Sequence, residues 1–575
     1  MATAALRGTS GITTEIASAI NGTEIEPFKP LTTSPNLNLA PPCKLRQRRL
    51  NLKAPARAKA RQGMGLNLER RVARKGDIEL LKRARLRTLG RIATAILGSA
   101  LALPVSAVPV AAGVLMHPTV SDYVQISTST TPPTEAQCFA ATPPPTHRRC
   151  FTPQAIRAAY NVSPLYAAGF DGHGVTIAIV DAYGSDTIAH DLHVFNQAFN
   201  LPGMCGEEGV TCSSGMPTFS QLHLQGSPAT KPQPGKGTGQ EDKSAWALEV
   251  SLDVETAHAM APGANILLVT TPTAETLGVQ GFPDMMNAEQ YVVDHHLATV
   301  ISQSFASTEE AFGSSASLMH LRHAFVSAAA NGVTVLGSSG DFGSAGVIKT
   351  PVHQGGQLLP NPAVWWPASD PLVTGVGGTY LCTDATNTTT RVVDSASPPV
   401  NCQAQPGVAE VGWIASGGGF SHVFAKPSYQ NTLPAGSTAI GSMRGVPDIG
   451  LQASSRTGAL VYISLPNAGQ SGLQCGSSPC STGWYDIGGT SLSCPQWAAL
   501  VAIAGQMKGH GLGLINPALY SIANSGKYAG DFFDVTAGNN AEFVQGHNAT
   551  TGWDPVTGLG TPNAANLIPD LAAAS

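Results

Sequence analysis

The chain of 575 residues has a formal net charge of −4, with 42% apolar and 12% charged residues. This apolar content is enough for one large hydrophobic core and excludes an intrinsically disordered chain. The charge is unevenly distributed, because residues 1–107 carry 19 Lys and Arg against 6 Asp and Glu, whereas residues 108–575 carry 14 against 31.

The basic N-terminal part ends in a segment typical of a signal peptide. The basic stretch Arg83 to Arg91 precedes the apolar run 92–103, and small residues follow up to Ala107. This order predicts export, and we therefore exclude nucleic-acid binding as the role of the basic charge. We expect residues 1–107 to be a leader and the protein to be secreted. A membrane anchor is the alternative, if the uncharged segment 92–116 stays uncleaved.

Residues 108–149 are predicted to be a Thr/Pro-rich linker that is too short for a folded prodomain. In it we expect Arg148-Arg149 to be an exposed, cleavable pair. Nine cysteines follow the leader, and pairing them in order closes four short loops, 138–150, 205–212, 382–402 and 475–480. Cys494 is then left over as a buried free thiol. No pair has the spacing of a zinc site, so we expect no zinc.

The remaining chain, residues 150–573, is predicted to be one α/β domain with a central parallel sheet and helices on both faces. Apolar runs predict strands at 175–181, 265–271, 299–305, 333–338 and 371–376. Helical spacing predicts helices near 240–260, 317–331 and 491–507. We expect this domain to be a monomer.

The helix at 240–260 carries two carboxylates, Glu249 and Asp253, which are four residues apart and so project from one face. Like charges at this spacing weaken an isolated helix, so the pair indicates a shared proton or a common partner. A solvated acidic face is the plain structural alternative. Further along the chain, the strand at 333–338 ends in small residues and Asp341, at the end of a parallel strand where sites of α/β proteins lie.

A glycine-rich turn, Gly488-Gly489-Thr490, places Ser491 at the start of a long apolar helix. Small residues let the backbone approach a bound group, and the N-terminus of a helix favours developing negative charge. The turn therefore suits a nucleophilic serine, although Ser or Thr capping of the helix is the plain alternative.

Together these three segments resemble the sedolisin (serine-carboxyl peptidase) family, which has a subtilisin-like fold. The resemblance runs from about Cys150 to the end of the chain. Further similar motifs occur in the same order, at Phe151 to Tyr160, Trp366 to Thr379, Ser416 to Ser421 and Arg444 to Asp448. The resemblance implies a secreted peptidase that takes protein or peptide substrates, by either endopeptidase or tripeptidyl cleavage.

The resemblance also implies a role for each candidate residue. Ser491 would be the nucleophile, Glu249 the general base, Asp253 the group that orients and polarises Glu249, and Asp341 the hydrogen-bond donor to the oxyanion. A carboxyl donates a hydrogen bond only while it is protonated, and a carboxylate base works near its own pKa. We therefore expect activity at acidic pH.

Two segments depart from the pattern of the family. Phe305 and Ala306 stand where a tryptophan and a glycine are usual in the substrate-binding strand, and Asp181 stands where a glutamate is often found. We expect Asp181 to support the catalytic residues or to lie at the end of its strand.

Two other functions are weighed against this one. A subtilisin-type peptidase needs a histidine base, but the helix carries Glu249, and His258 lies nine residues further on, on the opposite face. A non-catalytic secreted binding protein on the same fold would have lost at least one of the four candidate residues, and all four are present.

A second candidate site lies near the C-terminus. Two carboxylates, Asp534 and Asp554, stand on glycine-rich turns together with backbone carbonyls, and such oxygen ligands suit Ca²⁺. The segment is similar to the single calcium site of the sedolisins. On that resemblance, Asp534 and Asp554 would bind one structural Ca²⁺ by side chain, and Val535, Thr550 and Gly552 by backbone carbonyl.

Overall fold

In the computed structural model the described residues are 122–142, 148–224, 240–274, 281–349, 356–382, 409–466 and 471–575. The leader, the segment 92–116 and Cys402 lie outside them. Within the part that the structure describes, no helix is both long enough and apolar enough to cross a bilayer.

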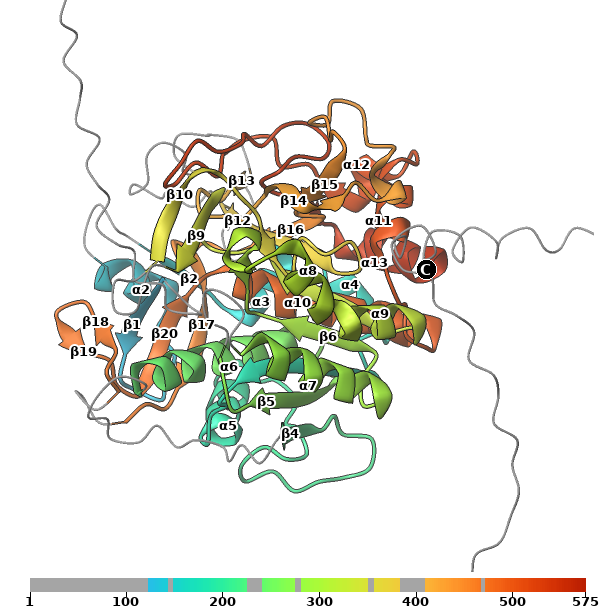
Figure 1. Cartoon of the computed structure of the whole chain (residues 1–575). Coiled ribbons are helices and arrows are strands. Elements are labelled where there is room, and N and C mark those ends of the chain that lie inside the picture. Colours follow the sequence, from blue (N-terminus) through green and yellow to red (C-terminus); the bar gives the residue numbers. More distant parts are fainter. Residues whose placement is uncertain are drawn as a thin grey trace, which may run out of the picture. The chain divides into compact units, whose positions relative to one another are not determined.

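An eight-stranded sheet forms the centre of the described fold, with the order β13-β12-β8-β6-β3-β5-β4 and with β16 also paired to β12 (Figure 1). All neighbours in this sheet run parallel except β13, which is antiparallel to β12. The strands are β3 (Thr176–Ala182), β4 (Phe219–His223), β5 (Asn265–Thr271), β6 (Val300–Gln303), β8 (Thr334–Ser338), β12 (Thr374–Leu381), β13 (Glu410–Gly412) and β16 (Ile449–Gln452).

Helices cover both faces of this sheet, as the alternating side chains of β3 show. Ile177 and Ile179 belong to one hydrophobic core with α6 (Gln240–Met260) and α10 (Thr490–Lys508). Ala178 and Val180 belong to a second core with α7 (Phe282–Asp294) and α9 (His323–Ala330). Successive strand residues point to opposite faces, so the two cores lie on the two sides of the sheet. The predicted α/β class is confirmed.

A second sheet, of four strands, has the order β1-β20-β17-β2. Its strands are β1 (Tyr123–Ser127), β2 (Arg149–Phe151), β17 (Thr457–Ile463) and β20 (Gly483–Ile487). β20 runs antiparallel to β1 and β17, and β2 runs parallel to β17. This sheet matters for the site because β20 leads directly into the turn before α10.

The remaining elements are short. The helices are α2 (Glu135–Ala141), α3 (Pro153–Ala159), α4 (Ser163–Ala167), α5 (Ile188–Phe199), η2 (Glu309–Ala311), α8 (Ser315–Met319), η3 (His320–Arg322), η4 (Ser428–Gln430), α11 (Asn516–Ala523), α12 (Tyr528–Asp531) and α13 (Ala564–Ala574). The strands are β7 (Ser307–Thr308), β9 (Ala345–Lys349), β10 (Gly356–Pro362), β11 (Trp365–Trp366), β14 (Gly419–Ala425), β15 (Met443–Val446), β18 (Gln474–Cys475), β19 (Ser478–Pro479), β21 (Phe532–Phe533) and β22 (Thr561–Pro562).

The N-terminal part of the predicted linker differs from the expectation. Residues 122–142 contain β1 and α2, and β1 pairs with β20 more than 350 residues further along the chain. The prediction that the Arg148-Arg149 pair is exposed is wrong. Arg148 is 8% exposed and pairs with Asp122, while Arg149 lies in β2 and pairs with Glu135. Strand pairing and burial here override the Thr/Pro-rich composition.

Three of the predicted disulfides are present, Cys138–Cys150, Cys205–Cys212 and Cys475–Cys480, and Cys494 is free and buried. Cys382 is also disulfide-bonded, but its predicted partner Cys402 lies outside the described residues. The predicted helix 317–331 is divided into α8, η3 and α9, whereas the predicted helix 240–260 coincides with α6.

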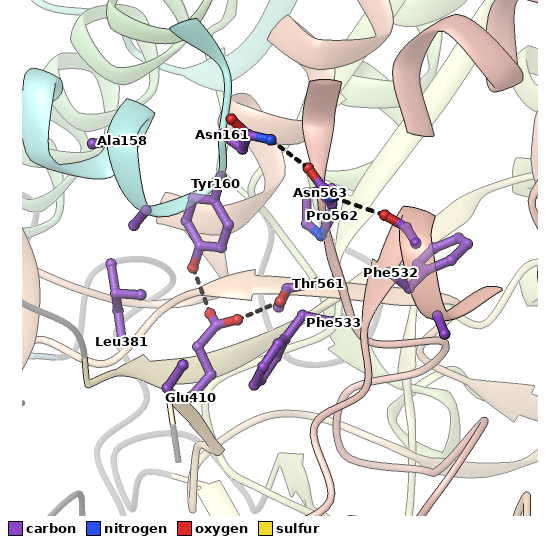
Figure 2. Close-up of a pocket in the computed structure, with 14 residues that line it drawn as sticks. Ala158, Tyr160, Asn161, Leu381, Glu410, Phe532, Phe533, Thr561, Pro562 and Asn563 are labelled. Atoms are coloured by element: carbon purple, nitrogen blue, oxygen red, sulfur yellow. Dashed lines mark hydrogen bonds between the residues drawn. The ribbon is translucent and has the colours of Figure 1, made fainter. Parts of the chain in front are cut away.

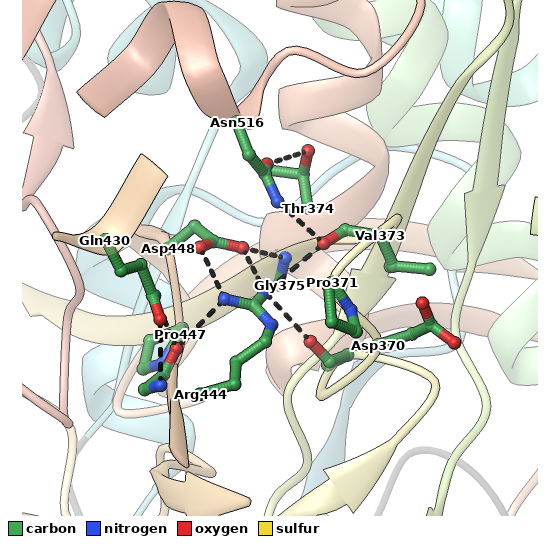
Figure 3. A network of polar contacts seen from close by, with 12 residues as sticks. Asp370, Pro371, Val373, Thr374, Gly375, Gln430, Arg444, Pro447, Asp448 and Asn516 are labelled. Atoms are coloured by element: carbon green, nitrogen blue, oxygen red, sulfur yellow. Dashed lines mark hydrogen bonds and ion pairs between the residues drawn. The ribbon is translucent and has the colours of Figure 1, made fainter. Parts of the chain in front are cut away.

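A buried ion pair fixes the edge of the central sheet (Figure 3). Arg444 donates from both terminal nitrogens to Asp448, at 2.9 and 2.6 Å, and both side chains are fully buried. Asp448 also accepts from the backbone N–H of Gly375 in β12, at 2.8 Å. The bidentate pair therefore joins β15 and β16 to β12, which is the role that this motif has in the described fold.

Candidate active site

Ser491 lies at the N-terminus of α10, where it is 6% exposed. The turn before it is held closely against the segment 453–455. The backbone N–H of Gly489 donates to the carbonyl of Ala453 at 2.6 Å. Gly489 has φ 129°, a conformation that favours glycine, and a Cβ on Gly488 would lie 2.2 Å from the backbone nitrogen of Ser455. The two glycines therefore let the chain turn tightly and present the serine at the start of the helix.

Glu249 and Asp253 lie on α6, which packs directly against α10. Both side chains are fully buried. Burial raises the pKa of the Cys494 thiol to about 12, and the charge of Asp253 contributes to this rise. Cys494 is three residues after Ser491, and so on the same face of α10, and Asp253 lies near enough to this helix to act on the thiol.

Three carboxyl groups share this buried region, because Asp181 lies at the end of β3, next to α6. Burial raises the pKa of Asp253 well above its usual range, and the charges of Asp181 and Glu249 raise it further. The nearby Ser304 hydroxyl opposes this rise. Burial also raises the pKa of Asp181 to about 8. Like charges this close cannot all ionise, so the group holds at least one proton in acid and can accept and return another.

Asp341 lies against the same turn from the end of β8. Its Oδ1 accepts hydrogen bonds from the backbone N–H and the hydroxyl of Thr490, at 2.7 and 2.8 Å. Its Oδ2 faces Gly489, since a Cβ there would lie 2.7 Å from this oxygen. Burial raises the pKa of Asp341 to about 6, against the opposing effect of the Thr490 hydrogen bonds. In acid the carboxyl is therefore protonated and can donate a hydrogen bond beside Ser491.

The structure thus places Asp341 against the turn that carries Ser491, and it places Glu249 and Asp253 on α6, the helix that packs against α10. His258 does not join them. It is buried elsewhere on α6, with its Nε2 2.9 Å from the carbonyl oxygen of Pro202, and burial lowers its pKa to about 4. Phe305, expected in the substrate-binding strand, is 2% exposed and packs against Phe282.

Sequence reasoning missed three residues around the site. Thr490 belongs to the predicted glycine-rich turn, but the sequence does not predict its hydrogen bonds to Asp341. Ser304 directly precedes Phe305, and nothing in the sequence indicates that it lies near Asp253. Asp122 lies in the predicted linker and contacts the catalytic turn, which only the pairing of β1 with β20 reveals.

The predicted calcium ligands lie in two segments that come close together. Asp534 accepts from the backbone N–H of Gly552, at 3.0 and 3.1 Å, and from the hydroxyl of Tyr528 at 3.2 Å. Asp554 is fully buried and accepts from the backbone N–H of Thr550 at 3.1 Å. The charges of both carboxylates act on Tyr528. Carboxylate oxygens are ligands that a hard cation such as Ca²⁺ prefers, but the described residues contain no group of three or more His, Cys, Asp or Glu that could hold a metal ion.

Two cavities lie elsewhere in the described fold. One, of about 360 Å³, has Glu410 at its base (Figure 2). The Glu410 carboxylate accepts from the hydroxyls of Tyr160 and Thr379, at 2.7 and 2.9 Å, and from Thr561. The other, of about 410 Å³, is lined by residues at the N-terminal ends of β3 and β6 and by three histidines, His173, His296 and His510. Neither cavity includes a residue of the candidate active site.

Comparison with known proteins relates the chain to a group of peptidases, although no model of a protein family matches it. The chain is 32% identical to kumamolisin of Bacillus sp. (strain MN-32) over 427 residues, which cover 73% of this chain and 63% of that protein. It is 29% identical to tripeptidyl-peptidase 1 of Canis lupus familiaris over 356 residues, 58% of this chain and 53% of that protein. It is 32% identical to sedolisin of Pseudomonas sp. (strain 101) over 288 residues, 50% of this chain and 43% of that protein.

A solved structure agrees with these relatives. The fold is similar to that of Pseudomonas sedolisin, a serine-carboxyl proteinase complexed with two molecules of pseudo-iodotyrostatin, with a TM-score of 0.53 and 25% identity. The match covers 74% of this chain and 99% of that chain. The chain spans about half to two thirds of the length of the curated relatives it matches.

Proposed function

The chain belongs to the sedolisin (serine-carboxyl peptidase) family, and we propose that it hydrolyses peptide bonds of protein or peptide substrates in acid. In this proposal Ser491 is the nucleophile, Glu249 is the general base and Asp253 orients Glu249. Asp341 donates the hydrogen bond to the oxyanion. The observation that carries the proposal is the bonding of Asp341 to the turn of Ser491, together with the packing of α6, which holds the buried Glu249 and Asp253, against α10.

The proposed reaction passes through an acyl-enzyme. Ser491 Oγ attacks the carbonyl carbon of the scissile bond while its proton passes to the Glu249 carboxylate. The carbonyl oxygen becomes an oxyanion, which the protonated Asp341 and the N-terminus of α10 stabilise. Glu249 then gives its proton to the leaving amine, and the C–N bond breaks. In the second half Glu249 takes a proton from water, the hydroxide attacks the acyl carbon, and the proton returns to Ser491.

Acidic pH suits this set of residues for two reasons. Asp341 donates only while protonated, and its pKa of about 6 keeps it protonated in acid. Glu249 must be ionised beside Asp253, and the raised pKa of Asp253 leaves the proton of the pair on the partner that does not react. The first condition fails as the pH rises, because Asp341 ionises.

The test is a pH–rate profile on a denatured protein substrate. We expect a maximum below about pH 5, since carboxyl groups replace histidine as the titrating groups. The variants Ser491→Ala, Glu249→Ala and Asp253→Ala should lose activity while keeping the wild-type melting temperature to within a few degrees. An optimum at alkaline pH, or a fully active Glu249→Ala, would sink the assignment. Mass spectrometry of the products then decides between endopeptidase and tripeptidyl cleavage.

Secretion of a monomer is part of the same proposal. The disulfides Cys138–Cys150, Cys205–Cys212 and Cys475–Cys480 support folding in an oxidising compartment. The signal-like segment ending at Ala107 supports export. Expression of the full chain in a secreting host, followed by N-terminal sequencing of the protein in the medium, tests this proposal. Retention of the full-length chain in the membrane fraction would favour the uncleaved anchor 92–116.

A structural Ca²⁺ at the C-terminal loop is the second part of the proposal. Asp534 and Asp554 would hold it by side chain, and Val535, Thr550 and Gly552 by backbone carbonyl. The ion would supply positive charge between two carboxylates and join the two loop segments that carry Asp534 and Asp554. Binding to the folded state alone stabilises it. Chelation at pH 6 should therefore lower the melting temperature of the wild type, and added Ca²⁺ should restore it.

The Asp554→Ala variant is the control for calcium. It should melt at the lower temperature with or without chelator, and it should keep Ser491 chemically competent at low temperature. A wild-type melting curve that chelator leaves unchanged would show that the loop is only a turn.

A further inference from the structure

β1 and the residue before it, Asp122, lie beside the catalytic turn. β1 runs antiparallel to β20 with Tyr123 opposite Ile487, and the backbone N–H of Gly488 donates to the carbonyl oxygen of Asp122 at 3.3 Å. Gly488 is three residues before Ser491. The start of β1 therefore lies beside the turn that carries the proposed nucleophile.

The backbone carbonyl of Asp122 contacts this turn, and its side chain bonds to two other segments. Its Oδ1 accepts from Arg148 at 2.5 Å, at the start of β2, and its Oδ2 accepts from the hydroxyl of Ser455. Ser455 belongs to the segment 453–455 against which Gly488 and Gly489 are packed. Asp122 thus contacts the catalytic turn through its backbone carbonyl, and its carboxylate bonds to Arg148 and to Ser455, which lies in the segment packed against the turn.

The charge of Asp122 is retained inside a cluster of charged groups. Burial alone would raise the pKa of Asp122, but Arg148, Ser455 and Arg456 together lower it below its usual value. The same cluster contains Asp486 in β20, whose Oδ2 lies 4.0 Å from Arg148 and whose pKa burial raises well above its usual range. Asp122 is therefore the ionised carboxylate of the cluster in acid.

The charge of Asp122 raises the pKa of two other carboxyl groups, those of Asp341 and Glu542. The pKa of Asp341, raised chiefly by burial, is raised further by Asp122. Glu542, in the loop that follows β21, has a pKa raised to about 7 by burial and then by the charges of Asp341 and Asp122. A negative charge behind the turn favours the protonated form of Asp341, which is the form that donates a hydrogen bond.

We propose that Asp122 is a positioning residue of this peptidase, which fixes the turn 488–491 through its backbone carbonyl and through Ser455, and which acts electrostatically on Asp341. The inference rests on the proposed function of Ser491 and Asp341. It gives Asp122, which precedes the peptidase core, a part in holding the catalytic turn. The disulfide Cys138–Cys150 and the ion pair of Arg149 with Glu135 hold α2 next to β2.

The test measures kcat and KM separately across the pH range for the wild type and for Asp122→Asn. The amide keeps the shape of the side chain and removes its charge. We expect kcat to fall about tenfold with a smaller change in KM, because the turn is less well held. We also expect the alkaline limb of kcat to move to lower pH by about half a unit, because Asp341 ionises more readily without the neighbouring charge.

Glu135→Gln is the matched control. It removes a carboxylate from an ion pair of the same segment, but this pair does not contact the catalytic turn. The variant should keep the pH profile of the wild type. Ser455→Ala separates the two effects, because it removes one hydrogen bond of Asp122 and leaves its charge. It should lower kcat without moving the alkaline limb, and it keeps the proposal testable if Asp122→Asn does not fold.

The outcomes are distinguishable. An active wild type with an acid optimum, and an Asp122→Asn variant with both the same kcat and the same alkaline limb, would overturn the inference and leave the proposed function standing. A lower kcat and melting temperature with an unmoved limb would reduce Asp122 to a structural residue and overturn the electrostatic part. An unchanged kcat in Ser455→Ala would overturn the positioning part. A wild type without acid peptidase activity would overturn both the function and the inference.

Discussion

Asp341 illustrates how burial and hydrogen bonding set the task of a single carboxyl group. Two hydrogen bonds from Thr490 favour the ionised form, yet burial raises its pKa to about 6. The outcome is a group that is a donor in acid and an acceptor near neutrality. Because Thr490 is bonded to Oδ1, the proton belongs on Oδ2, the oxygen that faces Gly489. In the proposed mechanism this proton points to the oxyanion.

Replacing Asp341 by Asn and by Ala separates donation from acidity. An amide donates a hydrogen bond at any pH, so Asp341→Asn should retain more activity than Asp341→Ala and should remain active at higher pH than the wild type. Loss of one oxyanion donor costs about 10²–10³ in rate, which is the fall expected for Asp341→Ala. The measurement is kcat from about pH 3 to pH 8. Equal losses in both variants, with no change in the alkaline limb, would give Asp341 another role.

At the scale of elements, α6 and α10 are unusual in being buried on every side. From Thr490 to Gly505 all residues of α10 are buried, and so are nearly all of α6 from Ser244 onwards. Such helices cannot be amphipathic, and polar residues on them are held without water. This desolvation is why the pKa of Asp253 is raised well above its usual range, and the charges of Asp181 and Glu249 raise it further.

The turn that joins β20 to α10 should tolerate no side chain at Gly489. Its φ of 129° is strained for any other residue, and an added Cβ would lie 2.7 Å from Asp341 Oδ2. Gly489→Ala should therefore lower kcat by about 10²-fold through displacement of Asp341, and should also lower the melting temperature. Gly441→Ala is the control, since an added Cβ there meets nothing within 4 Å. Wild-type activity in Gly489→Ala would refute the close approach.

At the scale of the whole molecule, buried carboxyl groups make the folded state more basic than the unfolded chain. Burial raises the pKa of Asp181 to about 8 and that of Asp191 to about 6, from an ordinary value of 3.8. At a pH between the ordinary pKa of 3.8 and these raised values, the folded protein binds more protons than the unfolded chain. The stability that these groups contribute is complete below about pH 4 and is lost as the pH rises through their folded pKa values.

We therefore expect the melting temperature to fall as the pH is raised from about 4 to about 8, with Ca²⁺ held constant. For Asp191 alone, a shift of about two pKa units corresponds to at most about 3 kcal/mol of the free energy of unfolding. Asp191→Asn should flatten the part of the curve below about pH 6, because its amide does not titrate. Calorimetry across this range checks the prediction, and a protein more stable at neutral pH than in acid would contradict it.

Much of the candidate site follows from local sequence. A glycine-rich turn before an apolar helix indicates Ser491, and two carboxylates four residues apart on a helix that ends at Pro262-Gly263 indicate Glu249 and Asp253. The short disulfide loops can likewise be predicted, because cysteines close in sequence are close in the folded chain. These features depend on interactions over a few residues, and such interactions leave periodic or spacing signals in the sequence.

Only the tertiary structure decides the rest. Residues 122–142 have the composition of a linker, and they become β1 and α2 because β20, hundreds of residues away, offers a free edge to pair with. That pairing brings Asp122 beside Arg148, Ser455 and the catalytic turn, and no spacing in the sequence predicts it. The pKa values of Asp181, Asp253 and Asp341 are likewise decided by packing, since desolvation depends on what surrounds a carboxyl group in space and not on its neighbours in the chain.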